Sequence, residues 1–103
     1  MNELEGLVKD YRVAFLRYLP QKDEAALAQG YEIGRAAVAR HISVLHLTQV
    51  HHLVLSEILA DTRSTDLSCV VAAAGEFQRE VLAAFDLAQR RRPDAPDAAT
   101  PTP

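Results

Sequence analysis

The chain has 103 residues, with 11 Lys plus Arg against 14 Asp plus Glu and a net charge of -3. This length suits one domain with a single modest core and is too short for a two-lobed catalytic cleft. The weakly acidic composition argues against nucleic acid as a partner, because the one basic run, Arg90–Arg92, is explained by the dipole of a helix C-terminus.

Four helices are predicted from the apolar residues, which recur about every 3.6 positions. The first spans about residues 2–19 and ends against Pro20, and the second spans about 23–41. The third, 44–60, takes Ser43 as its N-cap, and the fourth covers about 65–91. Short connections favour antiparallel neighbours, so the predicted fold is an all-α, antiparallel four-helix bundle formed by residues 1–92. The proline-rich residues 93–103 are expected to be a disordered tail or linker.

Two glycines, Gly30 and Gly34, lie inside the second predicted helix. Each is less favourable than alanine in a helix interior by about 1 kcal/mol. We therefore expect a neighbouring backbone to approach this helix closely enough to compensate for the loss.

Four histidines, at 41, 46, 51 and 52, fall within 12 positions. No pair among His41, His46, His51 and His52 has the i, i+3 or i, i+4 spacing by which one helix holds zinc. His51 falls on the apolar face of the third helix, where a buried histidine that makes one hydrogen bond is the commoner outcome. A helical metal- or ligand-binding protein that uses these four histidines is the alternative hypothesis. A pH-sensing role for His51 also stays open, because burial shifts a titration that lies near neutrality.

No residue is predicted to be catalytic, and neither a metal nor a cofactor is expected. The serines lie at caps or on polar faces, without the strand-turn-helix setting of a nucleophile elbow. The four glycines form no phosphate-binding cluster. The single cysteine, Cys69, excludes an internal disulfide, and neither a signal-peptide pattern nor an apolar run of about 18 residues is present. We expect a cytoplasmic protein without a membrane partner.

Apolar residues also occur outside the predicted core faces. Single exposed apolar side chains are ordinary, but several on so small a domain predict a surface that another polypeptide covers. A symmetric homodimer is the commonest such arrangement. The predicted partner or dimer surface comprises Val13, Leu16, Ile33, Ala37, Leu45 and Leu87.

The stretches KDYRVAFLRYL, YEIGRAAVARHIS and LTQVHHLVLSEIL resemble the N-terminal domain family of RsbU, the phosphoserine phosphatase of bacterial stress-response partner switching. The similar positions run from about Leu4 to Leu59, and the fourth helix matches only in length and pattern. They include Tyr11, Tyr18, Leu27, Arg35, His41, Val50, His51 and Leu55.

The resemblance implies a four-helix bundle of the type shared with the C-terminal domain of the clock protein KaiA. It also implies a homodimer without catalytic activity, on which a switch kinase related to anti-sigma factors docks to activate a phosphatase domain. The hypothesis from the sequence is therefore a noncatalytic interaction and dimerisation module that regulates a phosphatase in a stress or sigma-factor pathway.

Overall fold

The computed structural model describes residues 3–91 as four α-helices and one short 3-10 turn. The elements are α1 (Glu3–Gln21), α2 (Glu24–Ala39), α3 (Val44–Ala60), the turn η1 (Ser64–Asp66) and α4 (Leu67–Arg91). No strand occurs in this part of the chain, which confirms the all-α four-helix fold. The tail predicted at 93–103 lies outside the described residues.

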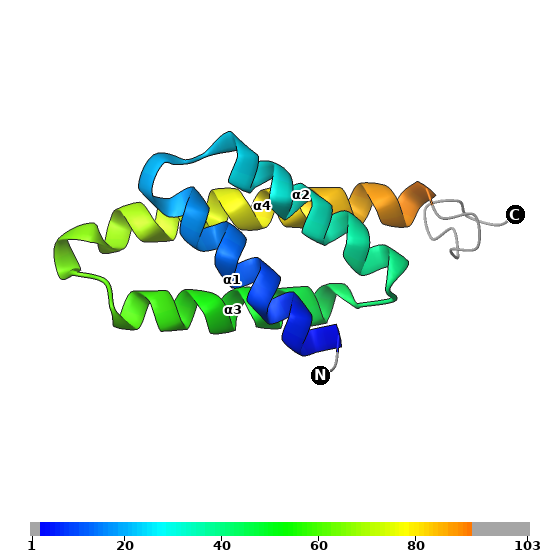
Figure 1. The fold of residues 1–103 in the computed structure, drawn as a ribbon, viewed down its shortest axis with the longest axis horizontal. Helices are drawn as coiled ribbons and strands as arrows, with labels where there is room; N and C mark the ends of the chain where they lie inside the picture. Colours follow the sequence, from blue (N-terminus) through cyan, green and yellow to red (C-terminus); the bar gives the residue numbers. More distant parts are fainter. Residues whose placement is uncertain (1–2, 92–103) are drawn as a thin grey trace, which may run out of the picture.

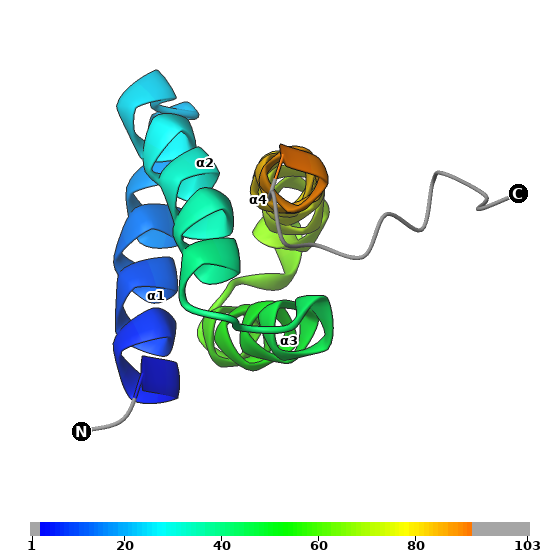
Figure 2. The ribbon, with the colours of Figure 1, turned by 90° about the vertical axis from the view of Figure 1, so that its right-hand side faces the viewer.

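The four helices form two layers of two (Figures 1 and 2). One layer is the hairpin of α1 and α2, and the other is the hairpin of α3 and α4. The first hairpin crosses the second obliquely, so that α2 packs closely on α4 while α1 spans both helices of the other layer. With 25 residues, α4 is the longest helix and runs along the whole bundle in Figure 1.

The core lies between the two layers and is built around aromatic rings. Phe15 from α1 stacks on Phe77 from α4 with ring centroids 5.5 Å apart, and Tyr11 meets the same Phe77 edge-on at 5.2 Å. Aliphatic side chains from all four helices surround these rings. They include Leu7, Ala37, Leu47, Val50, Val54 and Val81, all of which are buried.

The helix ends follow from local capping chemistry. The Asp23 carboxylate accepts a hydrogen bond from the Ala25 amide at 3.0 Å, and the Ser43 hydroxyl accepts one from the His46 amide at 3.1 Å. Both confirm the helix starts that the sequence predicts. The first helix, in contrast, does not stop at Pro20 but continues to Gln21. Proline occupies its last turn here, where only one further residue has to follow the helix.

The end of α2 is formed by a residue in the left-handed conformation. His41 has φ 60°, its amide donates to the Val38 carbonyl at 3.1 Å, and the Ile42 amide donates to the Ala37 carbonyl at 2.8 Å. These two bonds are the Schellman arrangement that closes a helix C-terminus. The conformation favours glycine, and histidine occupies it here without a side-chain role in the core.

The two helical glycines mark the place where α2 and α4 touch. A methyl group on Gly34 would collide with the backbone carbonyl of Val81. A methyl group on Gly30 would lie 2.9 Å from the ring of Phe77. The close backbone approach expected from the sequence is therefore confirmed at Gly34, while at Gly30 the neighbour is a side chain.

Candidate protein-interaction site

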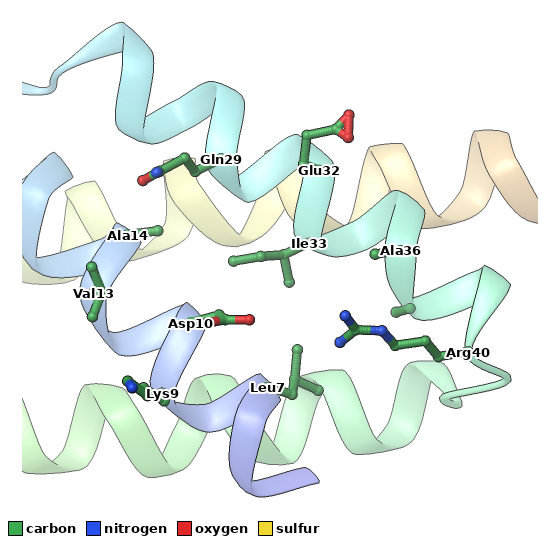
Figure 3. Close-up of a pocket in the computed structure, with 11 residues that line it drawn as sticks. Leu7, Lys9, Asp10, Val13, Ala14, Gln29, Glu32, Ile33, Ala36 and Arg40 are labelled. Carbon is green, nitrogen blue, oxygen red and sulfur yellow. The ribbon is translucent and has the colours of Figure 1, made fainter. Parts of the chain in front are cut away.

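A hollow of about 480 Å³ lies between α1 and α2, on the outer side of their hairpin (Figure 3). We call it the α1–α2 groove. Its apolar surface is formed by Leu7, Val13, Ala14, Ile33, Ala36 and Ala37. Its polar rim is formed by Lys9, Asp10, Gln29, Glu32 and Arg40.

The groove exists because the residues of α2 that face α1 at this end are small. Ala36 and Ala37 carry only methyl groups, so the side of α2 next to Leu7 is not filled by a long side chain. Val13 is 49% exposed on the α1 wall, and Ile33 is half-buried on the α2 wall. The two walls therefore present aliphatic surface to solvent, in a volume that lies within the usual range for ligand-binding clefts.

The polar side chains on the rim fall into two classes. Glu32 is held by Arg35, whose Nη2 lies 3.1 Å from a Glu32 carboxylate oxygen, and Gln29 accepts from Arg17 at 3.2 Å. Lys9, Asp10 and Arg40, in contrast, make no ion pair or hydrogen bond through their side chains within residues 3–91. Figure 3 shows the Asp10 carboxylate and the Arg40 guanidinium pointing toward one another across the groove.

The structure brings three of the six residues of the predicted surface together, since Val13, Ile33 and Ala37 all line the α1–α2 groove. Ala37 nevertheless corrects the prediction, because it is only 2% exposed and belongs to the core. α2 packs closely against its neighbours, so its buried face is wider than the positions of its larger apolar residues indicate. Ala26, another small residue of α2, is also buried.

The other three residues of the predicted surface lie elsewhere. Leu16 lines a separate depression with Pro20, Arg63 and Cys69, between the end of α1 and the start of α4. Leu45 is 63% exposed at the start of α3, and Leu87 is exposed near the end of α4. The six residues thus do not form one continuous patch.

The four histidines are dispersed. His41 closes α2, His46 and His52 are exposed on α3, and His51 is buried. Within residues 3–91 no group of three or more His, Cys, Asp and Glu side chains is arranged to hold a metal ion. The site of the alternative hypothesis is therefore not assembled by these helices.

His51 is buried in the core formed by residues 3–91, and its side chain is paired. Its Nδ1 lies 2.6 Å from the Tyr11 hydroxyl, and Phe15 stacks on its ring at 6.3 Å. Burial, and secondarily the charge of His52, lowers the pKa of His51 below its ordinary value of 6.5. Burial also raises the pKa of the Tyr11 hydroxyl above 10.0. A neutral imidazole with its proton on Nε2 accepts the Tyr11 proton, which satisfies both groups.

A second polar cluster joins the end of α1 to α4. The Tyr18 hydroxyl donates to Glu76 at 2.9 Å, and Lys22 Nζ donates to the same carboxylate at 3.0 Å. The bond from Lys22, and then that from Tyr18, holds the pKa of the Glu76 carboxyl below its ordinary value of 4.5. Glu76 thus connects the end of α1 to α4.

Sequence reasoning missed Asp10 and Arg40 as candidate interaction residues. Both belong to polar faces, and single charges on such faces carry no pattern. A usable signal is their spacing from apolar groove residues, because Asp10 precedes Val13 by three positions and Arg40 follows Ala36 by four. Residues so spaced lie side by side on a helix.

None of the helices formed by residues 3–91 combines the length and the apolar composition that a bilayer crossing needs. No curated protein and no solved structure gives a significant match to the chain. A family model does match, that of the N-terminal domain of the phosphoserine phosphatase RsbU, and it covers residues 9–88. This span includes most of α1, all of α2 and α3, and nearly all of α4. The chain therefore belongs to the family of RsbU N-terminal domains.

Proposed function

We propose that this chain is a noncatalytic regulatory module of a bacterial partner-switching pathway. In this proposal it forms a homodimer in the cytoplasm and binds a switch kinase of the anti-sigma-factor class. Binding of that kinase controls a phosphatase in a stress or sigma-factor response. The observation that carries the proposal is the family match over residues 9–88, which spans the helical bundle rather than one motif.

The surface of the bundle supports an interaction role. Nine large apolar side chains are exposed among the described residues, although a domain of this size needs most of its large apolar residues for its core. They are Leu4, Val13, Leu16, Val44, Leu45, Leu53, Leu67, Val71 and Leu87. These residues lie on several faces, which is what a module needs if it contacts both a second copy of itself and a different protein.

The experiment that tests the proposal is a calorimetric titration of the purified chain with the purified switch kinase from the same genome. We expect a saturable complex of fixed stoichiometry, whereas a protein kinase of unrelated fold should give no heat beyond dilution. The absence of binding to the switch kinase at concentrations up to the millimolar range would contradict the proposal.

A further inference from the structure

We infer that the α1–α2 groove receives a helical segment of the partner protein, one that presents an aliphatic side chain between an acidic and a basic side chain. The inference rests on the proposed function, because it assumes that a heterologous protein binds this chain. It adds the place where the partner binds and the chemistry of the segment that fits there.

The apolar surface of the groove calls for an aliphatic side chain. Val13 and Ile33 line opposite walls of the groove and, together with Ala36, keep part of their aliphatic surface in contact with water. An aliphatic side chain placed between them removes this surface from water, whereas a polar side chain there would lose its own hydration without a hydrogen bond in return.

The unpaired charges specify what must flank that side chain. Asp10 and Arg40 point toward one another across the groove but make no ion pair (Figure 3). A segment that carries a cation and an anion can meet both at once, the cation against Asp10 and the anion against Arg40. Glu32 does not compete for the cation to the same extent, because Arg35 already neutralises it.

A helix presents these three side chains without strain. Residues three or four apart lie on one face of a helix, about 5–6 Å from their neighbours. An acidic, an aliphatic and a basic residue at this spacing therefore project from one side, and insertion of such a face into a groove is a common mode of recognition.

A second copy of this chain leaves the groove empty if the two-fold axis of the dimer passes through it. A dimer of that kind brings the two grooves face to face, so that a hollow meets a hollow and stays unfilled. We assign the groove to the heterologous partner, and insertion of another element of a second copy away from the axis is the outcome that the cross-linking experiment below would detect.

Two matched substitutions test the apolar contact. Val13→Asp places a carboxylate on the groove wall, and Val71→Asp makes the same change on the outer side of α4, where Val71 is 52% exposed against 49% for Val13. We expect Val13→Asp to weaken binding of the purified switch kinase by about a hundredfold and Val71→Asp to change it by less than about threefold. Thermal melting of both variants should match that of the wild type, since neither side chain belongs to the core.

The charges are tested by neutralisation. Arg40→Gln should weaken the complex by about tenfold and reduce its sensitivity to salt, and Asp10→Asn should act in the same way. Arg79→Gln is the control, because Arg79 is exposed on α4 away from the groove. Arg40 follows the last residue of α2, so its variant is accompanied by a melting curve that confirms the fold.

A photoreactive benzoylphenylalanine at position 13 identifies the occupant directly. We expect it to cross-link to a helical segment of the switch kinase in which an aliphatic residue has an acidic and a basic residue within one turn. Cross-links to a second copy of this chain or to its residues 92–103 would overturn the inference. Equal cross-linking from positions 13 and 71 would overturn it as well.

The failure of the inference is distinguishable from the failure of the proposed function. If the wild-type chain binds the switch kinase and all three groove variants bind equally well, the groove assignment is wrong while the proposed function stands. If the wild-type chain does not bind the kinase, both are wrong.

Discussion

His51 illustrates how one buried polar residue can define part of a core. Its Nδ1 pairs with the Tyr11 hydroxyl at 2.6 Å, and no other hydrogen-bond partner of that hydroxyl occurs within residues 3–91. Protonation of His51 would put a proton on Nδ1, so Tyr11 would have to accept and its own proton would lose its acceptor. The folded state therefore favours the neutral imidazole, both through burial and through this bond.

This preference makes stability depend on pH. Because the pKa of His51 is lower in the folded state than its ordinary value of 6.5, the unfolded chain binds more protons as pH falls below that value. Stability from this residue is fully present above about pH 6.5 and is lost as pH falls from there toward the folded-state pKa. Urea unfolding at several pH values between about 7 and 5 gives the free energy of unfolding at each pH, and the loss is the slope of this free energy against pH.

The replacement His51→Asn should remove most of that slope, because the amide oxygen can accept from Tyr11 and does not titrate. His52→Asn on the exposed side of α3 is the control, and it should leave most of the slope in place. Equal slopes for the wild type and His51→Asn would show that His51 does not titrate differently on folding.

At the residue scale the sequence predicted His51 well and Ala37 badly. His51 falls on an apolar face that includes Leu47, Val50 and Val54, so its burial follows from helical periodicity. Its partner Tyr11 is 40 residues away in the chain, and no local pattern encodes that distance. Ala37 was placed outside because alanine adds little to an apolar arc, although small residues are what permit close helix packing.

At the scale of the elements, the contact of α2 with α4 is closest at Gly34, where a side chain is missing. A methyl group at Gly34 would meet the Val81 carbonyl, which belongs to a helix backbone and cannot rotate away. An alanine at this position would force the two packed helices apart. Such overpacking typically destabilises a protein by about 1–3 kcal/mol, whereas the higher helix propensity of alanine stabilises it by about 1 kcal/mol relative to glycine.

We therefore expect Gly34→Ala to lower the free energy of unfolding by about 1–2 kcal/mol, near the upper end of this difference because the clash is with backbone. Gly75→Ala is the matched control, because nothing lies within 4 Å of a methyl group built at Gly75 in α4. That change should stabilise the fold by up to about 1 kcal/mol. Chemical denaturation of both variants measures the difference, and a stabilising Gly34→Ala would contradict the close contact.

The end of α2 offers a change in the opposite direction. His41 is held at φ 60°, a conformation that costs a non-glycine residue about 1 kcal/mol. His41→Gly should therefore stabilise the protein by about 0.5–1 kcal/mol, as read from the urea midpoint. The same replacement at His52, in the middle of α3, should destabilise it. A loss of stability in His41→Gly would mean that its imidazole has a contact that outweighs the backbone strain.

Helix positions were predictable because each depends on neighbours in sequence. The apolar period and the caps at Asp23 and Ser43 locate all four helix starts to within about two residues. Pro20 misplaced the end of α1 by two residues, because a proline in the last turn removes one hydrogen bond without preventing the next residue from staying helical. The oblique crossing of the two hairpins, in contrast, depends on which faces meet, and sequence periodicity does not specify this angle.

At the scale of the whole molecule, the proposed homodimer is open to a direct test. Sedimentation equilibrium should show the average mass rising with concentration from 11.3 kDa toward twice that value. Leu45→Asp should oppose this association, because Leu45 is the most exposed of the large apolar side chains. An acidic residue in the first turn of α3 also suits the helix dipole, so the fold should tolerate the change.

A constant mass of a single chain over the whole concentration range would contradict the dimer.

The groove could not have been predicted from the sequence, because it arises between two helices and is shaped by the space that Ala36 and Ala37 leave empty. A sequence pattern records the side chains that are present on each helix, whereas a groove depends on the distance between helices.

The contact at Gly34 affects how the bundle responds when a molecule in the groove displaces α2. One face of α2 forms a wall of the α1–α2 groove, and a neighbouring face rests at Gly34 on the backbone of α4 with no side chain between them. Side chains usually absorb small displacements by changing rotamer, but at this point none is available to do so. A displacement of α2 that starts in the groove therefore moves α4 with it, because the two backbones are in direct contact at Gly34.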